Sequence, residues 1–162
     1  MAIVAVMFMT GCTDACKDVD CGTALQGTCV EGTCECLLGY EGDDCKTASQ
    51  TKFLGTYLEA GTCSVTGPEN STVTITASSD MTKILISGFW GLTVSFSANL
   101  SADGLSFTIP STNVSGTTVG DITVSGSGSR AATSTTITAS FSVIYGTPSV
   151  TDNCNNITWT KQ

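Results

Sequence analysis

Hydrophobic and polar residues alternate along most of the chain between residues 53 and 162. The stretch 92–100 alternates without a break, and 71–77 and 135–145 follow the same pattern. Because successive side chains of a β-strand point to opposite faces, a period of two predicts strands with one buried face. Turn-forming residues separate these segments. We therefore predict eight strands, at residues 53–61, 71–77, 83–89, 92–100, 105–109, 119–126, 135–145 and 156–161.

Two cysteines bear on how these strands are arranged. Cys63 follows the first predicted strand, and Cys154 precedes the eighth. The first and last strands of an eight-stranded up-and-down barrel are antiparallel neighbours, so these two positions would lie within reach of a disulfide. A bridge that closes so long a loop contributes roughly 4–5 kcal/mol in the chain-entropy model. We expect an all-β fold, with an eight-stranded antiparallel up-and-down barrel favoured over a β-sandwich.

The composition excludes several classes of function. Nine cysteines among 162 residues indicate an oxidising compartment. A net charge of −8 argues against binding to nucleic acid. Histidine is absent, so the chain lacks the base of Ser–His–Asp and Cys–His sites. The acids of the β region fall mostly in predicted turns, and Asp121, which falls in a strand, is interpreted as protection of a sheet edge. We expect no catalytic residues and no cofactor.

A second group of cysteines is crowded into a short segment near the N-terminus. The intervals between its six members contain four, seven, four, one and eight residues, and Gly39, Tyr40 and Gly42 precede the last one. This pattern resembles an EGF-like module. So short a chain buries too little apolar surface to fold unaided, so disulfides are needed to hold it. The resemblance implies the pairs Cys16–Cys29, Cys21–Cys34 and Cys36–Cys45.

Metal binding by this cysteine-rich segment is not favoured. Zinc sites of this kind use Cys-x2-Cys pairs or histidines, and the segment has neither. Calcium is the alternative, because some EGF-like modules bind it through acids near the first cysteine. We interpret Asp14, Asp18 and Asp20 as solvated surface acids instead, so we expect no metal. The chain then divides into an EGF-like module at 16–46, a polar linker at 47–52 and a β domain at 53–162.

The N-terminus predicts export. Residues 2–9 are apolar, which suits the hydrophobic region of a signal peptide and is too short to span a bilayer. Gly11 and Cys12 follow in a pattern that resembles the lipobox of bacterial lipoproteins. The resemblance implies a signal peptide at 1–11, a lipidated Cys12, and a tether at 12–15. The alternative is a cleaved signal followed by an ordinary cysteine. No Lys or Arg precedes the apolar run, which is consistent with a start upstream of Met1.

Two features suggest what the β domain binds. Phe89 and Trp90 fall in a turn between strands, where exposed aromatic side chains would form a binding surface for a protein or a glycan. The alternative is that this turn plugs the end of the core. The segment 53–57 resembles the Gly-x-Trp opening of lipocalin-like barrels, with Tyr57 in place of Trp. That resemblance implies a carrier of a small hydrophobic ligand, unless side chains fill the interior.

These expectations combine into one hypothesis. The protein is an exported lipoprotein, anchored in the bacterial outer membrane through acylated Cys12, on its periplasmic or its surface-exposed face. An EGF-like spacer carries a non-catalytic binding or adhesion module. The alternatives are a lipocalin-like carrier and a structural envelope protein without a ligand.

Overall fold

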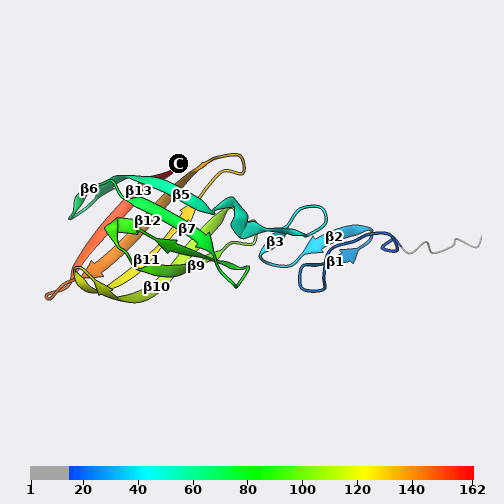
Figure 1. Cartoon of the computed structure of the whole chain (residues 1–162), viewed down its shortest axis with the longest axis horizontal. Helices are drawn as coiled ribbons and strands as arrows, with labels where there is room; N and C mark the ends of the chain where they lie inside the picture. The colour runs from blue at the N-terminus through cyan, green and yellow to red at the C-terminus, as the bar shows by residue number, and fades with distance from the viewer. Residues whose placement is uncertain (1–14) are drawn as a thin grey trace, which may run out of the picture.

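A computed structural model describes residues 15–162, and these residues form a small disulfide-rich module joined to an eight-stranded antiparallel barrel (Figure 1). The predictions of a signal peptide and of a lipidated Cys12 concern residues outside this range. Among the described residues, no helix is long and apolar enough to span a membrane.

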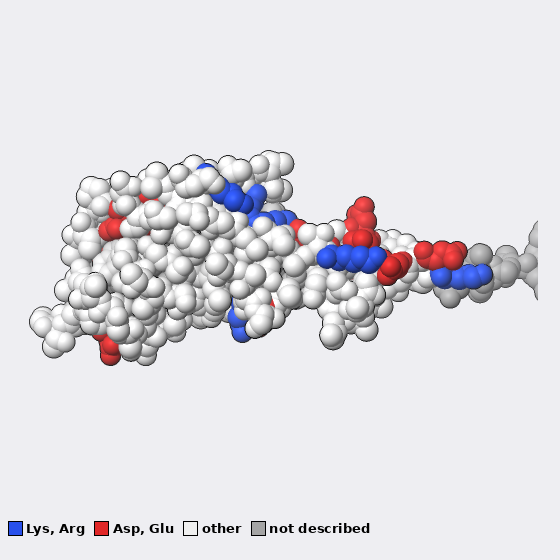
Figure 2. All heavy atoms as spheres, viewed as in Figure 1, with Lys and Arg blue, Asp and Glu red and all other residues white. Residues whose placement is uncertain are grey.

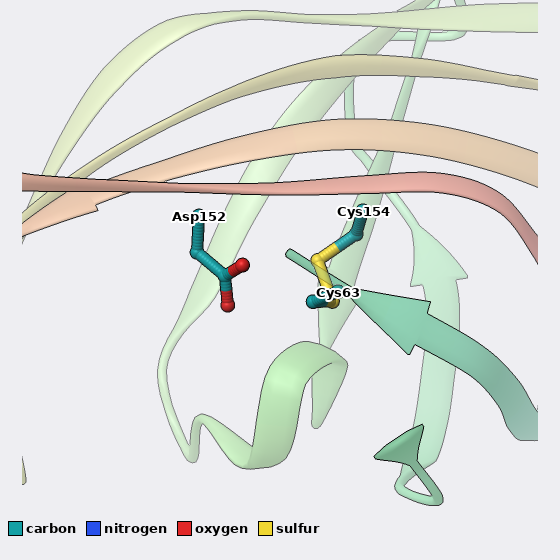
Figure 3. A group of neighbouring side chains, drawn as sticks. All are labelled: Cys63, Asp152 and Cys154. Carbon is teal, nitrogen blue, oxygen red and sulfur yellow. A yellow bond between two sulfur atoms is a disulfide. The ribbon is translucent and has the colours of Figure 1, made fainter. Parts of the chain in front are cut away.

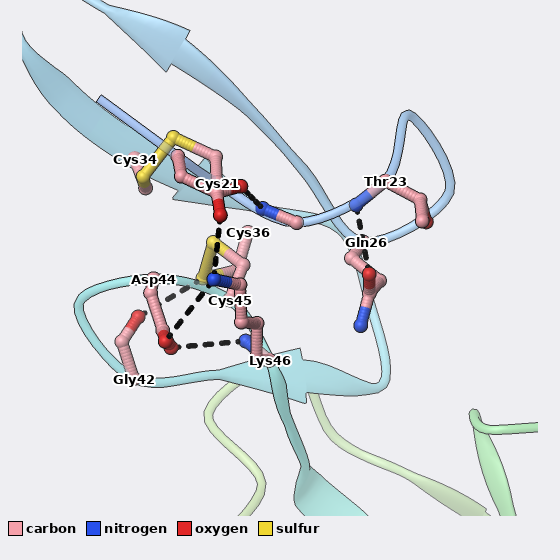
Figure 4. Close-up of polar contacts among 11 residues, drawn as sticks. Cys21, Thr23, Gln26, Cys34, Cys36, Gly42, Asp44, Cys45 and Lys46 are labelled. Atoms are coloured by element: carbon pink, nitrogen blue, oxygen red, sulfur yellow. Dashed lines mark hydrogen bonds and ion pairs between the residues drawn. A yellow bond between two sulfur atoms is a disulfide. The ribbon is translucent and has the colours of Figure 1, made fainter. Parts of the chain in front are cut away.

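The module consists of two short hairpins held by three disulfides. Strand β1 (Gly27–Val30) pairs with β2 (Thr33–Cys36), and β3 (Tyr40–Glu41) pairs with β4 (Thr47–Ala48). The Lys46 ammonium lies 2.7 Å from the Asp20 carboxylate, which links the two ends of the module. Figure 4 shows Lys46 beside Asp44, whose carboxylate accepts a hydrogen bond from the Lys46 backbone N–H at 3.1 Å. The disulfides join Cys16 to Cys29, Cys21 to Cys34, and Cys36 to Cys45, which are the pairs that the resemblance implies.

Residues 47–52, which the sequence analysis assigns to a linker, are folded. They form β4 and the 3₁₀ helix η1 (Ser49–Lys52). The Gln50 side chain is buried, accepts a hydrogen bond from the Ser78 N–H at 3.0 Å and donates one to the Ser78 carbonyl at 3.4 Å. Lys52 forms an ion pair with Glu41. The module is therefore packed against the barrel through side chains of the segment that was predicted to be a polar linker.

The barrel confirms the predicted fold class. Its eight strands follow one another in chain order around the wall, and pairing of the last strand with the first closes it. A short strand, β6 (Gly67–Glu69), extends the β5 edge. A second 3₁₀ helix, η2 (Phe89–Gly91), joins β8 to β9. The eight strands are β5 (Gly55–Cys63), β7 (Thr72–Ala77), β8 (Lys83–Ser87), β9 (Ser95–Leu100), β10 (Ser106–Thr117), β11 (Gly120–Ser129), β12 (Thr136–Tyr145) and β13 (Val150–Lys161).

Two strands, β10 and β13, are much longer than the alternation predicts. β10 continues to Thr117 instead of ending at Ile109, and β13 begins at Val150 instead of Asn156. Each contains a register shift, after Ile109 in β10 and opposite residues 139–141 in β13. A bulge inserts an extra residue and reverses the inward and outward positions beyond it, so a strict period of two ends there. Because β13 begins early, Cys154 lies within it, directly opposite Cys63 at the end of β5, and the two form a disulfide.

The barrel interior is a packed core. Phe53 meets Phe107 edge-on with ring centroids 5.6 Å apart, and Phe107 stacks on Trp159 at 6.0 Å. All three side chains are fully or almost fully buried, together with isoleucines from several strands. Aromatic rings at these distances are in contact. Side chains thus occupy the middle of the barrel, where a carrier would hold its ligand.

Candidate functional site at the distal rim

The end of the barrel that faces away from the module is here called the distal rim. It comprises residues 64–66, β6, η2 and the end of β12, and β6 marks it in Figure 1. The turn at η2 depends on a glycine: Gly88 has φ 79°, and a Cβ there would lie 2.0 Å from the Thr72 carbonyl oxygen. The Gly88 N–H bonds the Leu92 carbonyl at 2.9 Å, which closes the turn. Phe89 and Trp90 lie within this turn, and the first is buried whereas the second is partly exposed.

Phe89 is not at the surface, so the expectation that it forms part of an exposed binding surface is wrong. Its side chain is fully buried, with ring centroids 5.5 Å from Phe96, 4.0 Å from Phe141 and 6.2 Å from Trp159. The turn folds back over the barrel mouth and delivers this ring into the core. Phe89 therefore plugs the end of the core, which was the alternative interpretation of this turn.

Trp90 lies at the rim itself. Its ring is partly buried and lies 5.2 Å from the ring of Tyr145, the last residue of β12. The indole N–H donates to the Thr66 hydroxyl at 3.3 Å. Trp90 also has φ 52°, a left-handed conformation that bulky residues rarely adopt. Such strain persists only where surrounding contacts hold it, and it is common at binding sites.

Two acids, Asp152 and Glu69, hold the rim residues 64–66 in place through hydrogen bonds. The fully buried Asp152 accepts hydrogen bonds from the Val65 N–H at 2.7 Å, from the Thr66 N–H at 3.2 Å and from the Ser64 hydroxyl at 3.1 Å. The Thr66 hydroxyl lies 2.6 Å from Asp152 Oδ2 and 2.6 Å from Glu69 Oε1. Burial raises the pKa of Asp152, but these hydrogen bonds outweigh it, so the pKa lies below its ordinary value. Asp152 is therefore an ionised anchor for the loop at residues 64–66.

Glu59 is the most unusual group in the site, because its carboxyl is fully buried inside the barrel. It accepts from the Trp159 indole N–H at 3.0 Å and from the Trp90 backbone N–H at 3.2 Å. Burial raises the pKa of Glu59, the two tryptophan hydrogen bonds oppose this, and the charge of Glu69 adds to it, so the pKa lies above its usual range. Glu59 thus connects the core to the strained turn.

Sequence reasoning did not identify Glu59, Thr66, Tyr145 or Asp152 as members of this site. For Glu59 a signal existed, since it follows the inward Tyr57 by two residues and shares its face of the strand. Asp152 gave no signal, because the polar start of β13 did not alternate.

Charge is distributed unequally along the barrel axis. The four basic residues of the segment 47–162 belong to the module-facing end. Lys52 lies in η1, Lys83 begins β8, Arg130 follows β11 and Lys161 ends β13. Figure 2 shows the opposite end with red but no blue atoms on the visible face. In the part of the chain that the structure describes, neither Glu69 nor Asp152 forms an ion pair with a lysine or arginine.

Cys63, Asp152 and Cys154 lie close enough together to suggest a metal site (Figure 3). The two sulfur atoms are joined in a disulfide, and a disulfide offers no thiolate to a metal. The Asp152 oxygens already accept the hydrogen bonds of residues 64–66. These three residues are thus a structural group. In the module, Asp20 is engaged by Lys46, whose hydrogen bond lowers the pKa of this acid.

Replacement of Glu59 by glutamine should change how stability depends on pH. Below the pKa of the unfolded state both folded and unfolded wild type are protonated, so Glu59 imposes no ionisation penalty. As pH rises, the unfolded carboxyl ionises first, and the folded protein loses stability until the raised folded pKa is passed. Urea unfolding of wild type and Glu59→Gln between about pH 4 and 8 should show a difference that moves in favour of the variant with pH, by roughly 1.4 kcal/mol for each unit of raised pKa.

Asp152 has a lowered pKa, so its contribution to the pH dependence of stability has the opposite sign. This contribution is the same in wild type and in the variant, so it cancels in the difference between them. A difference that stays constant across this pH range would show that Glu59 ionises in the folded state as it does in water.

No family model, no curated protein and no solved structure matches this chain.

Proposed function

We propose that this protein is a bacterial outer-membrane lipoprotein in which an EGF-like spacer carries a non-catalytic binding barrel. Cys12 is the acylated residue in this proposal, and the distal rim is the surface that meets a partner. Stable anchoring needs more than one acyl chain. The lipid-modified cysteine of bacterial lipoproteins carries several.

The arrangement of the two parts supports this proposal. The N-terminal side of the described chain enters the module, the module packs on one end of the barrel, and the distal rim faces the other way (Figure 1). Gln50 and the ion pair between Lys52 and Glu41 fix the joint. A tether at the N-terminus would therefore hold the rim away from the membrane. This is the observation that carries the proposal.

The chemistry of the rim suits a neutral or weakly basic polar partner. Trp90 and Tyr145 offer partly buried aromatic surface, and the Thr66 hydroxyl and Glu69 carboxylate lie beside them. Aromatic faces next to hydroxyl and carboxylate groups suit both sugars and protein side chains. The packed core favours this outer surface over an internal carrier site.

Anchoring is tested in a bacterial host that processes lipoproteins. Wild-type protein should partition with membranes, and mass spectrometry should detect an acylated N-terminal Cys12 peptide. Cys12→Ser should be found in the soluble fraction. Soluble wild-type protein with an unmodified Cys12 would refute the anchor.

Binding is tested by isolating the protein with its native partner and comparing Trp90→Ala with Ile144→Ala. Ile144 is an exposed apolar residue next to Tyr145 on the outer face of β12, so it controls for loss of apolar surface. We expect at least a tenfold loss of partner or glycan binding for Trp90→Ala only. Equal binding by both variants would exclude the rim.

A further inference from the structure

The barrel wall is interrupted between β9 and β10. Among the described residues these strands pair only at Leu100 with Phe107 and at Asn99 with Thr108, although β10 runs on to Thr117. On their other sides, β9 pairs with β8 at five positions and β10 pairs with β11 at eight. Each strand thus has one edge bonded within the sheet and one edge left open toward the distal half of the barrel.

A groove occupies the place of the missing ladder, and we call it the seam. If the register of β9 and β10 continued, Ser95 would lie opposite Thr112, and Val94 opposite Asn113. These are the residues that line the groove, whose volume is about 510 Å³. That volume is in the usual range of ligand sites, roughly 300–1,000 Å³. The remaining lining residues are Thr93, Phe96, Val114 and Ser115.

The sequence explains why the strands part. Pro110 follows the last residue of β10 that keeps its register with β11, and the register shifts between Ile109 and Thr112. Proline has no N–H to donate to a neighbouring strand, and a bulge bends the strand that contains it. Both effects act one residue beyond Ile109 and turn β10 away from β9.

The lining of the seam indicates what it would accept. Phe96 and Val114 are buried on the interior side, whereas Thr93, Ser95, Asn113 and Ser115 are exposed. None of the lining residues is charged. Open strand edges present unpaired N–H and C=O groups, which are a template for another strand. A strand entering here would place alternate side chains over apolar and over small polar neighbours.

We propose that the seam is a strand-addition site that takes an extended segment of a partner polypeptide with alternating apolar and small uncharged polar residues. Main-chain hydrogen bonds supply the affinity, and the alternation supplies the register. The seam lies on the barrel wall, so the proposal depends neither on anchoring at Cys12 nor on partner binding at the rim.

A peptide display library provides the probe. Its members are about eight residues long and alternate Val, Ile, Leu or Phe with Ser, Thr or Asn. We expect selection of binders whose affinity falls at least tenfold when alternate peptide nitrogens are methylated, because methylation removes the N–H and leaves the side chains. In hydrogen exchange, those amides of 93–97 and 111–115 that face the seam and are not paired with β8 or β11 should exchange faster than the amides of β11 and β12, and they should slow when the peptide binds.

A pair of matched variants locates the site. Ser95→Lys with Ser115→Lys places two charges on the open edges and should weaken the peptide at least tenfold. Ser127→Lys with Ser129→Lys places the same charges at exposed positions on the fully paired β11 and should leave binding unchanged. The proposal is overturned by a library without binders, by equal binding of methylated peptides, or by equal effects of the two variants. Occupation of the seam by an uncharged oligosaccharide, or by a second copy of this chain, would overturn it as well.

Discussion

Replacing Cys63 and Cys154 by alanine should lower the free energy of unfolding of the barrel by about 3–5 kcal/mol. The disulfide spans a sequence separation of 91 residues and joins directly opposed positions of β5 and β13, the pair that closes the barrel. Without it, the unfolded chain regains the freedom of that loop. Both side chains are buried, so alanine avoids placing a polar group in the core.

Chemical unfolding of the oxidised double variant and of oxidised wild type, followed by tryptophan fluorescence, measures this loss. A reducing agent is an unsuitable substitute, because it would also open the three bridges of the module. The double variant should remain folded at low temperature, since the strand pairing and the core persist. A loss below about 1 kcal/mol would mean that β5 and β13 stay close in the unfolded protein without the bridge.

Phe89→Ala should destabilise the protein by about 3–5 kcal/mol, the usual cost of removing a fully buried phenylalanine. The ring contacts Phe96, Phe141 and Trp159, so its loss leaves a cavity under the turn that closes the barrel. Gly88 fixes the turn against Thr72, which limits how far the turn can collapse into that cavity.

Phe89→Leu is the matched variant, because it retains much of the apolar volume and should lose less stability. Thermal unfolding of the two variants, with Trp90→Ala alongside, separates core from rim. We expect the order of stability loss to be Phe89→Ala, then Phe89→Leu, then Trp90→Ala. A Phe89→Ala protein as stable as wild type would contradict the burial of this ring.

Alternation of apolar and polar residues was sufficient to predict an all-β fold with eight strands, and the positions of Cys63 and Cys154 favoured a barrel. Regular strands such as β7 and β12 were predicted nearly to their ends, because nothing in them interrupts the period of two. β10 and β13 were predicted too short, because a bulge next to Pro110 and another near Asn155 shift the phase. Only the partner strand reveals that pairing resumes beyond a bulge, and the partner is a matter of tertiary structure.

The site was predicted less well than the fold. Phe89 and Trp90 are neighbours in a turn, and no local pattern tells which ring enters the core. That choice depends on the left-handed conformations of Gly88 and Trp90. Asp152 and Thr66 are far apart in sequence and meet only because β13 closes against β5.

The bridge between Cys63 and Cys154 also determines how the protein would respond to mechanical force. A pull on the N-terminal side reaches the barrel at β5 and passes through the disulfide into β13. The residues enclosed by the bridge then add no length to the chain, which withholds roughly 300 Å of extension at about 3.4 Å per residue. Under a load on the two ends of the chain, only residues outside the bridges could add length, so the extension would stop far short of that of an unbridged chain.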